Sequence, residues 1–178
     1  VYVASGTFTM TGGNIGEEGN GNTATYGGGI SAISGEVVLD GETVIVKCNT
    51  SEFGGGLYIG TQGKLRILKA TIQNNSATNG GGLYLSSSLS GVSYDAMLAK
   101  VTYNTATGYG GGLYIKSGIL GSTNLEWLNA SIEISNNSAT SGGGLYVVNN
   151  GSVNLYKATI SNNYATLSGA GGYFDSKL

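Results

Sequence analysis

Apolar and polar residues alternate in short segments of this chain, and many of these segments follow a run of glycines. Leu57 and Ile59 flank Tyr58, for example, directly after three glycines. Alternation with a period of two is typical of a β-strand that packs one face on a core. The pattern therefore predicts strands at residues 57–59, 83–85, 113–115 and 145–147.

The glycine runs repeat along nearly the whole chain. Leu-Tyr follows the triplets at residues 54–56, 80–82, 110–112 and 142–144, and looser copies stand at 27–30 and 171–174. The last glycines of these runs are residues 29, 56, 82, 112, 144 and 172, so the period varies between 26 and 32 residues. A repeat of this length that tolerates insertions is typical of a solenoid.

A second motif places an asparagine three residues after an apolar residue in every repeat beyond the first. Ile72 precedes Asn75 in this way, and Ser-Ala-Thr follows. The asparagines of this motif are Asn22, Asn49, Asn75, Asn104, Asn137 and Asn163. A side-chain amide both donates and accepts hydrogen bonds, so inward copies on successive coils are expected to form a ladder along the axis.

Together the motifs predict an all-β fold, a right-handed parallel β-helix of about six coils with 26–32 residues per coil, as one domain over residues 1–178. Each coil adds a layer of about 4.8 Å, paired in parallel with its neighbours. The glycine triplet makes a tight corner that needs positive φ. The side chains expected to point inward include Leu57, Ile59, Leu65, Ile67, Ile72, Asn75 and Ala77.

These motifs resemble the repeats of the polymorphic outer-membrane proteins, whose passengers carry Gly-Gly-Ala-Ile and Phe-x-x-Asn signatures. Here the first appears as Gly-Gly-Gly before Leu or Ile, and the second as Ile or Val, two residues, then Asn. Glycine thus replaces alanine, and aliphatic residues replace phenylalanine. The resemblance covers nearly the whole chain and implies a surface-exposed, adhesin-like β-helix of the autotransporter-passenger kind.

Composition and charge exclude several classes of protein. Hydrophobic residues make up 40% of the chain and the net charge is −2, so the signature of disorder is absent. The basic residues are few and scattered, which argues against nucleic acid as a partner. No apolar run is long enough for a membrane span. Cys48 is the only cysteine, so no internal disulfide is expected, and we interpret it as a small core residue.

The sequence shows no recognisable arrangement of catalytic residues. Histidine is absent, which excludes a Ser-His-Asp or Cys-His arrangement, and the ten acidic residues fall mostly at different positions of the coil. Asp40 and Glu42 share one strand face, but Glu42 and Lys69 have the same offset in neighbouring coils. We interpret that match as an ordinary surface ion pair. The chain is therefore predicted not to be an enzyme and to need no cofactor or metal.

One outward column of the predicted strands is aromatic. Its members are Tyr2, Tyr58, Tyr84, Tyr114, Tyr146 and Phe174, and Ser31 interrupts it. Two interpretations stay open. The rings stabilise one another as cross-strand pairs, or they form an exposed ribbon that binds glycans or a neighbouring fibril.

Hydroxyl side chains form another outward pattern, with pairs flanking an inward alanine at residues 23–25, 76–78, 105–107 and 138–140. Such arrays resemble ice-binding surfaces, but this one breaks at Glu52 and Tyr164, and the β-propensity of threonine on a solvated face explains it. The sequons at Asn74, Asn129, Asn136 and Asn150 are candidates for N-glycosylation. A further sequon, at Asn49, falls on the inward column.

The two ends of the sequence fall at nearly the same point of the coil, because Val1-Tyr2-Val3 matches the strand after a triplet. This favours a segment of a longer array or a subunit that stacks end to end with itself. We expect an extracellular or cell-surface structural element, either a fibre subunit or the stalk of an adhesin. Carbohydrate binding along the aromatic column is the alternative, and a polysaccharide lyase or hydrolase or an ice-binding protein is more distant.

Overall fold

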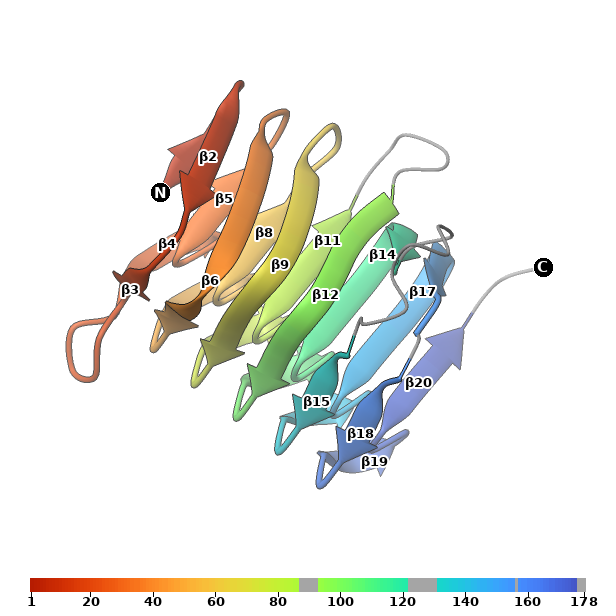
Figure 1. Ribbon diagram of the computed structural model, residues 1–178. Coiled ribbons are helices and arrows are strands. Elements are labelled where there is room, and N and C mark those ends of the chain that lie inside the picture. Colours follow the sequence, from red (N-terminus) through yellow and green to blue (C-terminus); the bar gives the residue numbers. More distant parts are fainter. Residues whose placement is uncertain (87–92, 122–130, 156, 176–178) are drawn as a thin grey trace.

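The computed structural model describes residues 1–86, 93–121, 131–155 and 157–175, and of residues 93–97 it describes the backbone alone. These residues form strands and turns, and no helix occurs among them. The strands run side by side and stack coil upon coil, from the N-terminal end to the C-terminal end of the solenoid (Figure 1). All pairings between the described strands that build the faces are parallel, as the repeat predicted.

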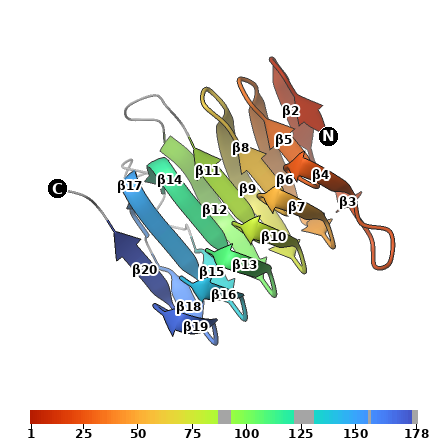
Figure 2. The ribbon, with the colours of Figure 1, turned by 180° about the vertical axis from the view of Figure 1, so that it is seen from behind.

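Three faces surround the core, and each takes its name here from a feature described below. The Tyr face contains β1 (Tyr2–Val3), β5 (Ile30–Ala32), β8 (Leu57–Ile59), β11 (Leu83–Ser86), β14 (Leu113–Leu120), β17 (Leu145–Val153) and β20 (Gly172–Asp175). The groove face contains β2 (Thr7–Met10), β3 (Gly13–Ile15), β6 (Glu36–Lys47), β9 (Lys64–Gln73), β12 (Ser93–Thr102), β15 (Glu133–Ser135) and β18 (Thr159–Ser161). The hydroxyl face, seen from behind in Figure 2, contains β4 (Thr23–Tyr26), β7 (Thr50–Phe53), β10 (Ser76–Asn79), β13 (Thr105–Tyr109), β16 (Ser138–Ser141) and β19 (Tyr164–Ser168).

The number of coils is slightly lower than predicted. The hydroxyl face has six described strands, and five complete turns lie between the first and the last of them. The solenoid therefore makes about 5 turns, where about six coils were expected. The coils at the two ends of the described chain are incomplete, and this accounts for the difference. The parallel β-helix itself is confirmed.

Aliphatic side chains fill the interior, and the predicted inward positions are correct. Leu57, Ile59, Leu65 and Ile72 are completely buried, and their equivalents on other coils stack on them to form one continuous core. Alternation explains this arrangement, because every second residue of a strand faces the same side.

The glycine triplets form the corner between the hydroxyl face and the Tyr face. The first glycine of a triplet has positive φ, as in Gly54 (φ 67°). The middle glycine is needed for a different reason: a Cβ on Gly81 would lie 2.5 Å from the carbonyl oxygens of Gly111 and Thr105 on the next coil. Neighbouring triplets approach this closely because their backbones are hydrogen-bonded, with the Gly81 N–H donating to the Gly110 carbonyl at 3.0 Å.

A single residue makes the corner between the groove face and the hydroxyl face. It directly precedes the ladder asparagines from Asn49 onward and has positive φ at all five positions: Cys48, Asn74, Tyr103, Asn136 and Asn162. Asparagine tolerates this conformation better than most residues, which explains the Asn-Asn pairs of the repeat. The prediction that Cys48 is a core residue is therefore wrong, because it sits at this corner and is only half-buried.

The last triplet lies one residue earlier than the sequence pattern suggested. Gly169 has the positive φ of a first triplet position, and Gly172 pairs with Leu145 as the first residue of the following strand. A shift of one residue moves every side chain of a strand to the opposite face. Tyr173, rather than Phe174, therefore continues the tyrosine column.

Candidate functional site

The asparagine ladder runs through the interior beside the single-residue corner. The Oδ1 of Asn104 accepts two hydrogen bonds from Asn75, from its backbone N–H and its Nδ2, each at 3.0 Å. The Nδ2 of Asn104 donates to the Ile72 carbonyl and to Oδ1 of Asn137, both at 3.0 Å. Every polar atom of this buried side chain therefore has a partner, which removes the cost of burying an amide.

The same contacts repeat along the ladder and join the six asparagines that the sequence motif singled out. Asn49, Asn75, Asn104 and Asn137 are at most 1% exposed, whereas Asn163 is half-buried and Asn22 is exposed. Asn22 still donates to Oδ1 of Asn49 at 2.8 Å, and Asn137 donates to Oδ1 of Asn163 at 3.0 Å. Each ladder asparagine thus accepts through Oδ1 from the preceding coil and donates its backbone N–H and Nδ2 to Oδ1 of the following asparagine, while Nδ2 also donates to a backbone carbonyl of the preceding coil.

The tyrosines of the Tyr face stack ring on ring along the axis. The centroids of Tyr58 and Tyr84 are 5.4 Å apart, those of Tyr84 and Tyr114 4.6 Å, and those of Tyr114 and Tyr146 5.3 Å. The column continues to Tyr173, whose centroid lies 4.8 Å from that of Tyr146. Because each inner ring has a ring against both of its faces, the aromatic faces themselves are covered.

A second set of aromatic residues meets this column, and the sequence analysis missed it. Tyr26, Phe53 and Tyr109 directly precede glycine triplets, and their rings reach across the corner to the column. The Tyr26 and Tyr58 centroids, for instance, are 4.9 Å apart. The signal was available as the aromatic residue before three of the glycine runs. We call the two sets together the aromatic ribbon: Tyr26, Phe53, Tyr58, Tyr84, Tyr109, Tyr114, Tyr146 and Tyr173.

The aromatic ribbon is packed more tightly than an exposed stripe would be. Tyr84 is only 8% exposed, and Tyr58, Tyr114 and Tyr146 are half-buried. Burial raises the pKa of Tyr84 well above its usual value, and the neighbouring tyrosines raise it further. Burial is also the main cause of the raised pKa values of Tyr58, Tyr114 and Tyr146. The ribbon thus covers the glycine corner from outside as a small external core.

Two members of the predicted column do not belong to the ribbon. Phe174 is in register with Val147 instead of Tyr146 and is 63% exposed, because of the one-residue shift of the last triplet. Tyr2 is in register with Ser31, which has no ring to stack on it, and Tyr2 is 69% exposed.

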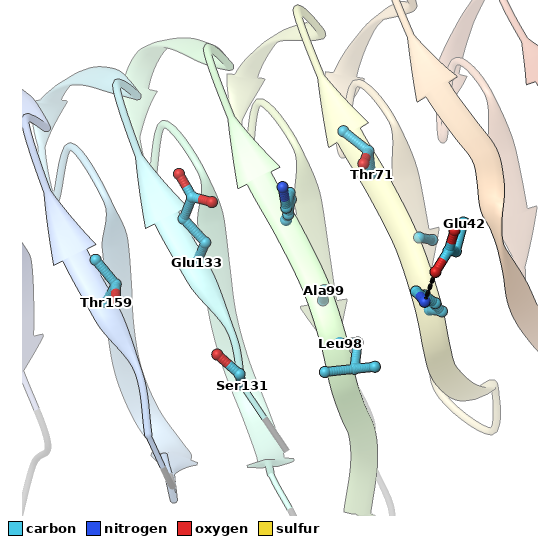
Figure 3. A pocket seen from close by; sticks show the side chains of 10 residues that line it. Glu42, Thr71, Leu98, Ala99, Ser131, Glu133 and Thr159 are labelled. Carbon is cyan, nitrogen blue, oxygen red and sulfur yellow. Dashed lines mark hydrogen bonds and ion pairs between the residues drawn. The ribbon is translucent and has the colours of Figure 1, made fainter. Parts of the chain in front are cut away.

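A groove of about 550 Å³ runs across successive strands of the groove face (Figure 3). Its lining comes from successive coils: Glu42, Lys69, Ala70, Thr71, Leu98, Ala99, Lys100, Ser131, Glu133 and Thr159. The small side chains of Ala70 and Ala99 are buried. Thr71, Lys100, Glu133 and Thr159 are in register, so they form one column along the axis in which the two charged residues lie next to each other and a threonine stands at each end.

Charge in the groove is balanced. Lys69 donates to Glu42, as the shared offset in neighbouring coils predicted, and this hydrogen bond and charge hold the pKa of Glu42 below its usual value. Glu133 accepts a hydrogen bond from Oγ of Ser135 at 2.7 Å, although Lys100 is its register neighbour. The groove therefore presents an ammonium, a carboxylate and hydroxyls side by side, with Leu98 as an apolar surface.

The candidate glycosylation sites and the paired hydroxyls differ in how far they are exposed. Asn74 and Asn150 are exposed and Asn136 is half-buried, Asn49 is buried in the ladder, and Asn129 lies outside the described residues. The paired hydroxyls of the hydroxyl face point outward, and Thr140 Oγ1 donates to the Thr107 carbonyl at 2.8 Å. Within the described ranges, no three His, Cys, Asp or Glu side chains are grouped closely enough for a metal ion. The same ranges contain no helix suited to crossing a membrane.

Stacked parallel coils, an internal asparagine ladder and glycine corners define this protein as a repeat-built parallel β-solenoid. Residues 131–148, which include Asn137 and Tyr146, match the Chlamydia polymorphic membrane protein (Chlamydia_PMP) repeat. The match and the fold confirm the resemblance to polymorphic outer-membrane and autotransporter-like β-helices. They fit a surface structural or adhesin-like role. No curated protein and no solved structure matches the chain.

Proposed function

We propose that this chain is a rigid, non-enzymatic stalk segment of an extracellular, adhesin-like surface protein. The polymorphic membrane protein repeat at residues 131–148 supports a place at the outer membrane or cell surface. The internal ladders support the mechanical part of the proposal, since every coil is bonded to both neighbours.

The asparagine ladder is the observation that carries this function. Asn75 receives bonds from Asn49 and gives bonds to Asn104, so each coil completes the hydrogen bonding of the next. In a solenoid of this kind each repeat packs on its neighbours, and the stability grows with each added interface. Such a body can hold a binding element at a fixed distance from a membrane.

Surface exposure is the first test of the proposal. Antibodies raised against the purified chain should label intact source cells, and protease treatment of intact cells should remove the label. Labelling that requires permeabilised cells would overturn the proposal. An antibody against a cytoplasmic protein of the same cells is the control for intactness.

A fibre subunit is the other form that a structural role can take. The ladder has a direction, because Oδ1 faces the preceding coil and the backbone N–H faces the following one, and this supports head-to-tail stacking of subunits. Negative-stain electron microscopy over a concentration series separates the two forms. Uniform filaments that lengthen with concentration would indicate a fibre, and short single rods at every concentration would indicate a stalk.

Carbohydrate binding is the second candidate, and the groove favours it more than the tyrosine column does. Sugars stack on free aromatic faces, and the inner rings of the ribbon have none. The groove instead offers Lys100, Glu133 and Thr71 as donors and acceptors next to Leu98. Saturable binding on a glycan array that falls with Glu133→Gln and Thr71→Val, but not with Thr78→Val on the hydroxyl face, would support this function.

A further inference from the structure

The aromatic ribbon holds phenol rings of neighbouring coils in repeated, nearly parallel contact. Tyr84 and Tyr114 have centroids 4.6 Å apart and an interplanar angle of 4°. Tyr146 and Tyr173 have centroids 4.8 Å apart and an angle of 5°. In both pairs the two residues are direct register partners on adjacent parallel strands, so the backbone holds the two residues side by side.

We propose that the ribbon is a site of oxidative modification, in which a one-electron oxidant couples Tyr84 to Tyr114 and Tyr146 to Tyr173 as intrachain dityrosine. Each phenol loses one electron and one proton to give a tyrosyl radical. Two neighbouring radicals then form a carbon–carbon bond between ring carbons ortho to the hydroxyls, and tautomerisation restores both aromatic rings. Two oxidant molecules are reduced and two protons are released for each link.

The stacked arrangement supplies what this reaction usually lacks, namely a second phenol held beside the first. Rings in contact also let an electron vacancy pass from one tyrosine to the next, so an oxidant needs to reach only one member. Tyr84 is 8% exposed, but its neighbours Tyr58 and Tyr114 are more accessible. The raised pKa values of Tyr84 and Tyr114 keep both phenols protonated at neutral pH, so proton loss accompanies electron loss.

Such links would change the mechanics of the solenoid. Residues 84 and 114, and residues 146 and 173, lie about one coil apart in sequence, so each link would fasten one coil covalently to the next. The unfolding midpoint of the linked protein in urea should therefore be higher than that of the unlinked protein. The inference depends on ring geometry and is independent of the proposed role at a cell surface.

The chain contains its own internal controls. Tyr103 and Tyr164 are 58% and 62% exposed, and no ring contact is recorded for either of them within the described residues. They are open to an oxidant, but none of the described side chains holds a phenol ring beside them. If exposure alone governed coupling, these two residues would react first and would join separate molecules.

Photo-oxidised ruthenium(III) tris(bipyridyl), with persulfate as the terminal electron acceptor, is a suitable one-electron oxidant. Dilute protein is illuminated, monomer is isolated on a denaturing gel, dityrosine fluorescence is measured, and the linked peptides are identified by mass spectrometry. We expect fluorescent monomer with links from Tyr84 to Tyr114 and from Tyr146 to Tyr173. The double variant Tyr84→Phe/Tyr146→Phe keeps the rings but removes alternate phenols, and should lose most of the monomer fluorescence.

The matched control is Tyr103→Phe/Tyr164→Phe, which should retain the monomer fluorescence of the unchanged protein. Fluorescence confined to cross-linked dimers would overturn the inference. So would equal loss of signal in the two double variants, or the same linked peptides in the same ratio from urea-unfolded chain. Circular dichroism of both variants before illumination verifies that each is folded.

Discussion

The two corners that border the hydroxyl face meet the same requirement in opposite ways. Both must turn the chain while keeping successive coils about 4.8 Å apart. At one corner the solution is internal and polar, with a buried asparagine after a residue of positive φ. At the other it is external and apolar, with glycines that have no side chain and tyrosines that cover them.

This difference predicts which kind of substitution destabilises each corner. The asparagine corner depends on hydrogen bonds that join three successive coils, so losing one side chain leaves polar atoms unpaired on both sides. The glycine corner depends on the absence of atoms, so adding one carbon is enough to disturb it. Changes at each corner, matched by a control on the same structural feature, test this contrast.

Replacement of Asn104 by leucine should have the largest effect. The change removes the acceptor of both Asn75 donors and leaves the Ile72 carbonyl and Oδ1 of Asn137 without that donor. Each buried polar group left unpaired costs about 1–3 kcal/mol, so we expect a loss of about 4 kcal/mol or more. Urea unfolding followed by circular dichroism measures it.

The control for this change is Asn22→Leu, at the exposed end of the same ladder. The Asn22 backbone N–H would still donate to Oδ1 of Asn49, and water can reach the site. A loss below about 1 kcal/mol is expected. Equal losses for Asn104→Leu and Asn22→Leu would show that the buried ladder is not what stabilises this corner.

Replacement of Gly81 by alanine tests the glycine corner. The added carbon would lie 2.5 Å from carbonyl oxygens of the next coil, which are backbone atoms and cannot move independently. We expect a loss of about 2–3 kcal/mol, the cost typical of overpacking. At Gly171 the nearest atom would be 3.5 Å away, so Gly171→Ala is the control and should be nearly neutral. Similar unfolding midpoints for both variants would contradict this account of the corner.

Alkaline pH should weaken the external core. The pKa of Tyr84 is raised by burial above the usual value of 10.0, so the folded protein holds this proton more tightly than the unfolded chain. The contribution of the Tyr84 phenol to the free energy of unfolding is therefore fully present below about pH 10. It is lost as the pH rises toward the folded pKa, at up to about 1.4 kcal/mol per pH unit. Urea midpoints measured from neutral to about pH 11 should fall.

Phenylalanine variants separate this effect from other groups that titrate at high pH. Tyr84→Phe keeps the ring but cannot ionise, so its stability should fall less steeply above about pH 10. Tyr164→Phe, at a residue that is 62% exposed, should follow the unchanged protein. If both variants show the slope of the unchanged protein, the buried phenol is not responsible for the alkaline loss.

The fold could be predicted from the sequence because the same pattern of inward, outward and corner residues recurs in successive coils. The inward position of Asn75 and the pairing of Glu42 with Lys69 both followed from offsets shared by neighbouring coils. Tyr173 was missed because an alanine, Ala170, breaks the last glycine run and hides its register. The burial of Tyr84 was missed because Phe53 reaches it across the corner, a contact that no spacing within one strand encodes.

The smallest expected effect is a gain. Ser51 occupies the inward position that is alanine on the neighbouring coils, in register with Ala24 and Ala77. It is 8% exposed, and its Oγ has no hydrogen-bond partner. Ser51→Ala should therefore raise the stability by about 1 kcal/mol, because the unpaired hydroxyl no longer has to be buried.

Ser135→Ala is the matched control for this last change, since it removes an equally buried hydroxyl that does have a partner. Ser135 is 2% exposed and its Oγ donates to Glu133 at 2.7 Å. A loss of about 1 kcal/mol is expected there, opposite in sign to the gain at Ser51. Opposite shifts of the two urea midpoints would show that hydrogen bonding, rather than side-chain volume, decides which polar residues this core accepts. A loss at both positions would mean that the Ser51 hydroxyl finds a partner in solution.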